Sequence, residues 1–375
     1  MKNKLTKVIH VSTVHPTFDN RIFFKECQSL SEANYEVILI TPYEETKVID
    51  KIKIIGISEP KNRIWRMLFT TCMATLLALN EKPSLFHLHD PELMPMGFFL
   101  SLMGKNVIFD MHENLPATIL NKRYLPKLLR KLLSNAFRFI ENIFLINQYI
   151  VLAENIYKRN HNWQNRKKIV LNFPQINKLL NIKEEKYNTF TAGYIGLITA
   201  KRGSRTMLKT TKLLSDRGHK ISLELVGKCE HRHRADLESY QQREKINNVR
   251  FHGFLKALDG YRIMARCHVG LVLLEPTPNY IRSYPTKLFE YMALGLPVVL
   301  SDFPFYRSIV SEANCALLVN PSDPVNIADA IQWIIKNPDA SAAMGARGRQ
   351  IVSQRYNWNT EAQKLIEFYK TILRK

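Results

Sequence analysis

The sequence lacks several features that would place it in well-known classes of protein. Its five cysteines are odd in number and form no C-x-x-C pair, which indicates reduced thiols and a cytoplasmic protein. The start of the chain, MKNKLTKVIHVSTV, has only a short apolar run with polar interruptions, which indicates a first strand and not a signal peptide. The glycine-rich pattern G-x-G-x-x-G is missing from the first loop, STVHPTFDNRIFF, and this disfavours a dinucleotide site at that loop.

Long hydrophobic runs are also missing, because no apolar stretch reaches the roughly 18 residues that a membrane-spanning helix needs. The composition, with 46% hydrophobic and 23% charged residues, is that of a soluble globular enzyme. A chain of 375 residues is too long for one ordinary core and suits two domains of similar size.

Acidic residues are few relative to basic ones. Lysine and arginine number 54 against 33 aspartates and glutamates, which gives a net charge of +21. The excess is clustered, since residues 121–170 contain eleven basic and two acidic residues, and residues 201–250 contain thirteen and six. An anionic lipid surface, nucleic acid and phosphorylated small molecules are the candidate partners.

Short β-rich runs alternate with longer helical patterns, which predicts an α/β fold with parallel sheets and helical crossovers. The first half contains VIHVSTV, EVILI, IKIIGI, LFHLH, NVIFDMH, YIVLA and KIVLNF, and the second half TAGYIG, ISLELVG, VRFHGF, VGLVLL, PVVLSD and ALLV. We therefore expect two Rossmann-like, doubly wound domains that face each other across a ligand cleft.

The predicted domain boundaries follow from these runs and from a polar, charged segment between them. Residues 1–175 form the first domain, 176–189 the linker, 190–354 the second domain and 355–375 a closing segment. Within the closing segment, Trp358 to Leu373 has the apolar periodicity of an amphipathic helix.

Residues 283–304, SYPTKLFEYMALGLPVVLSDFP, are the most informative part of the chain. Pro285 and Thr286 predict the start of a helix, with the threonine able to cap it. Lys287 and the N–H groups of the first turn favour a phosphate, while Glu290 on the same side offers acceptor oxygens to a ribose. These features predict a nucleotide-linked substrate. The alternative is a solvated lysine and glutamate on an ordinary amphipathic helix.

A second cationic loop follows the strand TAGYIG. Arg202 lies next to Gly203 and to Ser204, a candidate helix cap, and its guanidinium can bind a diphosphate through two hydrogen bonds. With Lys287 it would direct two positive charges at one leaving group. The alternative is a solvated basic loop.

In the first half, two apolar strands end in a histidine and an acid, in FHLHDPE and VIFDMHENLP. His89, Asp90, His112 and Glu113 therefore follow strand ends, where polar residues are good functional candidates. We favour His112 as a group that hydrogen-bonds a sugar. In the first loop, Asp19 and Arg21 could contact a ligand or serve as turn and capping residues.

Two sets of residues could conceivably bind a metal ion. One is His87, His89 and His112, and the other is Cys229, His231 and His233. Neither set has an established zinc-binding spacing, so no metal site is predicted.

The segment 121–144 combines leucines at helical spacing with basic residues between them. The leucines are Leu125, Leu128, Leu129, Leu132 and Leu133, and the basic residues include Lys127, Arg130, Lys131 and Arg138. This pattern is typical of a basic helix that lies on an anionic leaflet, and also of a helix whose apolar stripe packs on a core.

Five segments occur in the order found in retaining glycosyltransferases of family 4: HVSTVHPTFDNRIFFKECQSLSEANYEVILITP, HLHDPELMP, VIFDMHENLP, YIGLITAKRG and YPTKLFEYMALGLPVVLSDFP. From about residue 7 to 370 the chain resembles this family, and in particular a branch that assembles bacterial surface polysaccharides such as lipopolysaccharide, O-antigen, capsule or exopolysaccharide. The resemblance implies a metal-independent enzyme without a cofactor and with the two-domain GT-B fold. It also implies an acceptor in the first domain, a nucleotide-diphosphate sugar in the second, and a closing helix that crosses back to the first domain.

The resemblance further implies roles for single residues. Arg202 and Lys287 match the two cations on the donor diphosphate, and Glu290 matches the glutamate that binds the donor ribose. His112 resembles the histidine near the transferred sugar, and these four are the predicted catalytic residues. Gly196 and Leu288 complete the predicted donor site, and the predicted acceptor site consists of Asp19, Arg21, His89, Asp90 and Glu113.

Two departures from the family pattern matter. Arg282 stands where the first glutamate of the Glu-x7-Glu pattern is expected, and Leu197 stands where many members have an arginine. Binding of the donor diphosphate would then depend more heavily on Arg202 and Lys287, and the identity of the sugar is hard to infer.

The sequence therefore predicts a cytoplasmic enzyme, peripheral to the inner leaflet of the cytoplasmic membrane through residues 121–144. It would transfer a sugar with retention from a nucleotide-diphosphate donor to a lipid-linked or saccharide acceptor, and would not bind nucleic acid. A nucleotide-sugar epimerase or hydrolase on the same fold, and a basic nucleic-acid-binding protein, are the alternatives.

Overall fold

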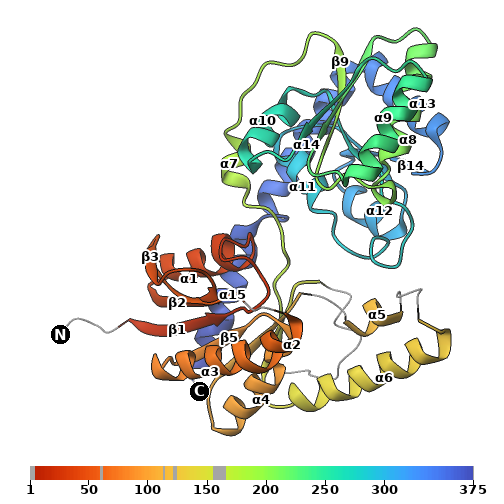
Figure 1. Cartoon of the computed structure of the whole chain (residues 1–375). Coiled ribbons are helices and arrows are strands. Elements are labelled where there is room, and N and C mark those ends of the chain that lie inside the picture. The colour runs from red at the N-terminus through yellow and green to blue at the C-terminus, as the bar shows by residue number, and fades with distance from the viewer. Residues whose placement is uncertain (1–4, 60–61, 113–114, 121–124, 155–165, 375) are drawn as a thin grey trace. The chain divides into compact units, whose positions relative to one another are not determined.

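The computed structural model describes residues 5–59, 62–112, 115–120, 125–154 and 166–374. The chain forms two compact units, of which the first is Met1–Asn172 together with Asn359–Lys375 and the second is Phe173–Trp358 (Figure 1). Each unit is an α/β domain built on its own sheet.

The sheet of the first unit has eight strands in the order β3-β4-β2-β1-β5-β6-β7-β8. All neighbours are parallel except β3 and β4, which are antiparallel. The strands are β1 Thr6–Val11, β2 Tyr35–Pro42, β3 Lys47–Ile49, β4 Ile52–Ile57, β5 Leu85–Leu88, β6 Val107–Met111, β7 Tyr149–Leu152 and β8 Lys167–Ile169.

The helices of the first unit include one that comes from the far end of the chain. They are η1 Ile22–Cys27, α1 Gln28–Glu32, α2 Arg63–Trp65, η2 Arg66–Thr70, α3 Thr71–Asn80, η3 Pro91–Leu93, α4 Met94–Leu102, α5 Leu115–Leu120, α6 Lys127–Phe144 and α15 Trp358–Leu373. Leu365 and Tyr369 of α15 are fully buried, and Glu361 Oε2 accepts a hydrogen bond from the N–H of Leu171 at 2.8 Å. The predicted return of the closing helix to the first domain is confirmed.

The sheet of the second unit is entirely parallel, with six strands in the order β11-β10-β9-β12-β13-β14. Its strands are β9 Phe190–Ile195, β10 Ile221–Val226, β11 Val249–Gly253, β12 Val269–Val272, β13 Val298–Ser301 and β14 Ala316–Val319. Its helices are α7 Ile176–Leu180, η5 Ala200–Arg202, α8 Ser204–Asp216, α9 His231–Arg243, α10 Ala257–Arg266, α11 Thr286–Ala293, α12 Pro304–Val310, α13 Pro324–Lys336 and α14 Pro338–Gln354.

The predicted strands are all present, because most are short apolar runs that become buried strands. In β13, for example, all four residues are buried, as expected for a strand covered on both faces. The predicted fold class of two parallel α/β sheets is therefore confirmed, with β3 as an unpredicted antiparallel edge strand.

The segment 176–189 differs from the linker that the sequence suggested. It contains the helix α7, whose Ile176 and Leu179 are buried, and it belongs to the second unit. Lys186 donates two hydrogen bonds, to the carbonyl oxygens of Ala265 and Cys267 at 2.9 and 2.6 Å. These contacts attach the segment to its domain.

Each sheet has a topological switch point, where the order in which the chain adds strands reverses from one side of the sheet to the other. In the first unit this point lies between β1 and β5, and in the second between β9 and β12. Loops that follow the carboxyl ends of such strands diverge, which leaves room for ligands. The candidate functional residues lie at these two places.

Candidate functional site

The helix α11, which connects the neighbouring strands β12 and β13, contains Lys287 and Glu290 of the 283–304 motif. Its N-cap is Pro285, so Thr286 is the first helical residue and not the predicted cap. Lys287 and Glu290 are partly buried and lie in the first two turns. Leu288 was predicted to belong to the donor site. It is fully buried and its N–H donates to the carbonyl oxygen of Pro285 at 2.9 Å, so both its side chain and its N–H are engaged within the helix and its surroundings.

Lys287 lies against Gly196, the residue that follows β9. A Cβ built on Gly196 would be 2.5 Å from Cε and 2.9 Å from Nζ of Lys287, and Gly196 has a φ of +134°. The Nζ atom is 5.5 Å from the centre of the Tyr194 ring. Burial, followed by the positive charge of Arg202, lowers the pKa of Lys287 to about 8, against an opposing effect of Glu290. The positive charge of Arg202 thus disfavours the protonated form of Lys287.

The loop after β9 orients Arg202. Gly203 has a φ of +78°, and a Cβ on it would lie 2.5 Å from the carbonyl oxygen of Leu273, so the turn requires glycine. Arg202 is half-buried and donates from Nε to the hydroxyl of Tyr280 at 3.3 Å. Ser204 is not the expected cap, because Gly203 occupies that position and the Ser204 hydroxyl bonds Nε2 of His233 at 2.9 Å.

Glu290 has a partner that the sequence did not suggest. The hydroxyl of Tyr261, in α10, donates to its Oε1 at 2.7 Å. Burial, followed by Glu290, raises the pKa of Tyr261 far above its ordinary value, so the phenol keeps its proton. The bond fixes one carboxylate oxygen of Glu290 and leaves the second oxygen for other donors.

In the first unit, a cavity of about 320 Å³ lies beside the carboxyl ends of the central strands. Its lining includes His15, Arg66, Glu92, His112 and Met67. The side chain of His112 is 15% exposed, and burial lowers its pKa below the ordinary value, so the ring is neutral at pH 7. His15 and Glu92 lie within segments singled out in the sequence but were not chosen as site residues, while no motif marks Arg66.

Two predicted acceptor residues have structural partners instead. The guanidinium of Arg21 is 3% exposed and donates to both carboxylate oxygens of Asp110 at 3.0 and 3.2 Å, and to the carbonyl of Val170 at 3.0 Å. Burial alone would raise the pKa of Asp110, but Arg21 and then His112 hold it below its ordinary value. Arg21 is therefore committed to the core of the first unit, and Asp19 accepts from the N–H groups of Arg21 and Ile22 as a turn residue.

Two further acceptor candidates, His89 and Asp90, are buried residues in the lining of this cavity. Asp90 is buried and accepts from the N–H groups of Thr13 and Val14 at 2.6 and 3.2 Å, so it shapes the first loop. His89 is buried, with Nδ1 3.2 Å from Nε2 of His112. Glu113 lies outside the described residues.

The conceivable metal sets assemble differently from the sequence-based grouping. Among the described residues, His89 lies with Asp110 and His112, and also with His10, Glu26 and His87. Across the same part of the chain, Cys229, His231 and His233 do not converge as metal ligands.

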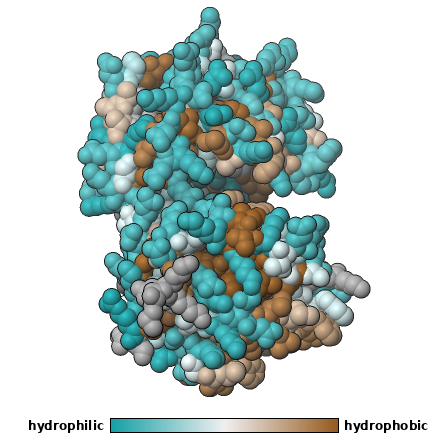
Figure 2. Space-filling view, turned by 90° about the vertical axis from the view of Figure 1, so that its left-hand side faces the viewer, coloured by the Kyte–Doolittle hydropathy of each residue, from teal (hydrophilic) through white to brown (hydrophobic). Residues whose placement is uncertain are grey.

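The leucines of α6 do not pack on the core of their unit. Leu128, Leu132 and Phe139 are 82%, 65% and 67% exposed, while Phe137 and Phe144 pack against the core from the other side of the helix. A second exposed apolar segment, which includes Ile64, Trp65, Leu68 and Phe69, lies in α2 and η2. Figure 2 shows one face of the molecule, on which hydrophobic side chains interrupt a mainly hydrophilic surface. No helix in the described part of the chain is long and apolar enough to span a bilayer.

Comparisons with known proteins agree with this arrangement. The sequence model of the family "Glycosyl transferases group 1" matches residues 175–351, which is most of the second unit. The D-inositol 3-phosphate glycosyltransferase of Corynebacterium urealyticum is 28% identical over 129 residues, 34% of this chain and 30% of that protein. The capsular polysaccharide biosynthesis glycosyltransferase CapM of Staphylococcus aureus is 22% identical over 200 residues, 52% of this chain and 50% of that protein. The chain thus spans half or less of the length of these curated relatives.

Solved structures resemble the chain over nearly its whole length. Anabaena HepE in complex with UDP-glucose has a TM-score of 0.72 at 14% identity, covering 97% of this chain and 99% of that one. WaaG, a glycosyltransferase involved in lipopolysaccharide biosynthesis, has a TM-score of 0.66 at 14% identity, covering 96% and 98%. At this identity the likeness defines the fold, which is GT-B.

Proposed function

We propose that the protein is a retaining glycosyltransferase that uses a nucleotide-diphosphate sugar as donor. The second unit binds the donor, with Arg202 and Lys287 on the diphosphate and Glu290 on the ribose. The first unit binds the acceptor at the cavity beside His112. The match of residues 175–351 to group 1 glycosyl transferases supports this assignment.

The observation that carries the proposal is the pair of cations at the end of β9. Arg202 contributes to the lowered pKa of Lys287, so the two charges oppose each other in the free protein. A diphosphate placed between them and the first turn of α11 would relieve this repulsion and meet free N–H groups at the helix N-terminus. The negative charge of a diphosphate is thus balanced by the two cationic side chains and the partial positive charge at the N-terminus of α11.

The same arrangement can promote the reaction. The bond between the anomeric carbon and the diphosphate oxygen breaks, and the electron pair leaves with the nucleoside diphosphate. Arg202 and Lys287 stabilise the negative charge that develops there, which preorganised cations do without reorganisation. The acceptor hydroxyl attacks from the same face and its proton passes to a phosphate oxygen of the leaving group. The two side chains supply the charge that a metal ion provides in other enzymes, so transfer is metal-independent.

The acceptor is lipid-linked or a saccharide, and the protein works at the cytoplasmic side of a membrane. The cavity of the first unit is lined by residues of η2 and α6, and both elements carry exposed apolar side chains. Lys127, Lys131 and Arg138 of α6 are exposed among its leucines, a combination that suits an anionic lipid surface. The product belongs to a surface polysaccharide such as capsule or lipopolysaccharide, in line with the named roles of CapM and WaaG.

A thermal-shift screen across UDP, GDP and their sugars tests the donor assignment, because a ligand that binds only the folded state raises the unfolding temperature. We expect one nucleotide series to stabilise the wild type and not the Lys287→Ala variant. Consumption of that donor should then require a lipid extract or saccharide acceptor. Donor consumption without any acceptor would instead favour an epimerase or hydrolase, and no stabilisation by any nucleotide would contradict the proposal.

A further inference from the structure

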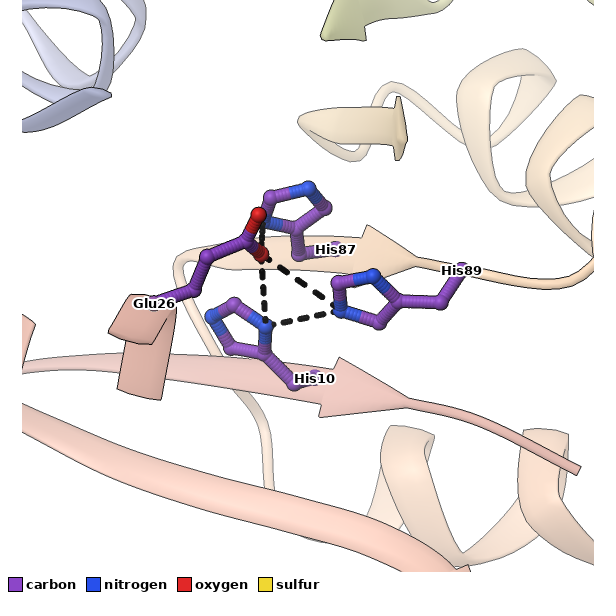
Figure 3. A group of neighbouring side chains, drawn as sticks. All are labelled: His10, Glu26, His87 and His89. Atoms are coloured by element: carbon purple, nitrogen blue, oxygen red, sulfur yellow. Dashed lines mark hydrogen bonds and ion pairs between the residues drawn. The ribbon is translucent and has the colours of Figure 1, made fainter. Parts of the chain in front are cut away.

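The core of the first unit contains an unusual group of polar side chains, the histidine cluster, made of His10, Glu26, His87 and His89. His10 lies on β1 opposite His87 of β5, and His89 follows two residues later on the same face. Glu26 reaches the group from the π-helix η1. All four side chains are fully buried, and Figure 3 shows them pointing toward one another.

One atom from each side chain borders a common point. Glu26 Oε2 lies 3.9 Å from Nδ1 of His10, 4.0 Å from Nδ1 of His87 and 4.0 Å from Nε2 of His89. Nδ1 of His10 and Nε2 of His89 share a hydrogen bond at 2.9 Å, which a metal ion at these atoms would replace. Ligand atoms around a tetrahedral zinc ion are about 3.4 Å apart, given bonds of about 2.1 Å. The observed separations bracket this value.

The carboxylate of Glu26 has an ion-pair partner in Arg21 but no hydrogen-bond donor directed at it. Neither of its oxygens accepts a hydrogen bond from any described residue. Arg21 Nε is 2.9 Å from Oε1, but its N–H is directed to Asp110. A buried carboxylate without a donor is costly unless a proton or a cation compensates it.

For two of the three histidines, His10 and His89, the opposite ring nitrogen also has a partner, as metal-binding histidines usually do, whereas Nε2 of His87 has no hydrogen-bond partner among the described residues. Nε2 of His10 is 3.2 Å from the hydroxyl of Tyr369, and Nδ1 of His89 is 3.2 Å from Nε2 of His112. The Tyr369 hydroxyl is also 2.7 Å from Nδ1 of His87, a hydrogen bond that a metal at this nitrogen would replace.

We propose that the histidine cluster binds a divalent transition-metal ion, with zinc the best match to three imidazole nitrogens and one carboxylate oxygen. The ion has a structural role, since the cluster is sealed from solvent and lies on a different unit from the proposed donor cations. It is taken up as the first unit folds. Donor chemistry therefore remains independent of it.

The metal content of the full-length chain without an affinity tag tests the site. We expect about one zinc ion per chain by mass spectrometry, retained when the native protein is dialysed against a chelator. Refolding from denaturant with zinc should give a higher unfolding midpoint than refolding with chelator. Refolding with cobalt should give the visible absorption of a tetrahedral ion with nitrogen and oxygen ligands.

Two variants locate the ion, and a third is the control. His10→Gln and Glu26→Gln should each carry below about one tenth of an ion per chain, because a three-ligand remnant binds weakly. His268→Gln removes a half-buried histidine that bonds the N–H of Thr191 in the second unit, and should retain the metal. If both cluster variants keep their zinc, or if wild type refolded with zinc, cobalt, iron or manganese stays metal-free, a shared proton accounts for the cluster and the proposal is wrong. Refolding of the wild type with metal ions tests the proposal even if the variants do not fold.

Discussion

Cε of Lys287 occupies the space in which a side chain on Gly196 would begin, at 2.5 Å from the position of its Cβ. The ammonium group therefore reaches the end of β9 only because that residue is glycine. The absence of a side chain at Gly196 therefore lets the ammonium group of Lys287 lie between the loop after β9 and its own helix, α11.

Gly196→Ala should abolish most donor binding, because the new methyl group must displace Lys287. We expect transfer to fall by about tenfold to a thousandfold, the range that follows loss of one charge-stabilising donor. Gly218→Ala is the matched control, since Gly218 also has a positive φ, +83°, but has no atom within 4 Å of a built Cβ. It should lose about 1–2 kcal/mol of stability from the backbone strain and keep its activity. Equal activity in the two variants would contradict the assignment of Lys287.

The pKa of Lys287, about 8, predicts a pH dependence of donor binding. The protonated form binds the diphosphate, so affinity should be constant below pH 7 and fall about tenfold for each pH unit above 8. In Lys287→Arg the guanidinium stays charged, so the decline should disappear. Titration of the nucleotide diphosphate by calorimetry between pH 6.5 and about 9.5 measures this directly.

The same shift affects the stability of the ligand-free protein, with a defined sign. The unfolded state binds more protons than the folded state between the folded pKa of about 8 and the ordinary value of 10.5. The contribution of Lys287 therefore makes the free energy of unfolding rise with pH across this window. Denaturant titrations at both ends of this pH window measure the effect. The free energy of unfolding of Lys287→Met should rise less between the two pH values than that of the wild type.

Arg202→Ala should reduce turnover by about tenfold to a thousandfold, because the leaving diphosphate loses one preorganised cation. Arg205→Ala is the control, since Arg205 is exposed and lies three residues further along the same basic segment. A steady-state assay with saturating donor separates the two. If both variants lost activity equally, the basic segment would act only through its overall charge.

The exposed face of α6 predicts binding to anionic vesicles. Wild type should sediment with phosphatidylglycerol-containing liposomes at low salt and less so at high salt. The double variant Leu128→Glu, Leu132→Glu should lose this binding, because it places charge on the apolar stripe. Asn135→Glu, Asn147→Glu adds the same charge at exposed polar positions and should bind better than the leucine variant. Equal loss in both pairs would reduce the interaction to electrostatics alone.

Most of the fold could be predicted because it depends on local patterns. The strands are short apolar runs, and α15 follows from the spacing of residues such as Leu365 and Tyr369. The edge strand β3 was missed because three residues, KVI, are too short to show a pattern. The helix cap at Thr286 was wrong by one position, as is common for helix ends.

The contacts that define the two sites could not be predicted, because they join residues far apart in the chain. Glu290 and Tyr261 come from different helices, and Glu26 approaches His89 through a π-helix that no propensity rule predicts. Arg21 looked available because it follows a loop, yet its partner Asp110 lies 89 residues away. Burial of a charged side chain depends on such a partner and is invisible in local sequence.

The position of α15 has a consequence for biosynthesis. Its Tyr369 hydroxyl bonds His87 in the centre of the first unit, although 282 residues separate them. Domains usually fold in the order in which the ribosome makes them. Here the amino-terminal domain lacks α15, which supplies buried residues such as Leu365 and Tyr369, until the whole second domain has been synthesised. Nascent chains of this protein should thus complete their carboxyl-proximal domain first.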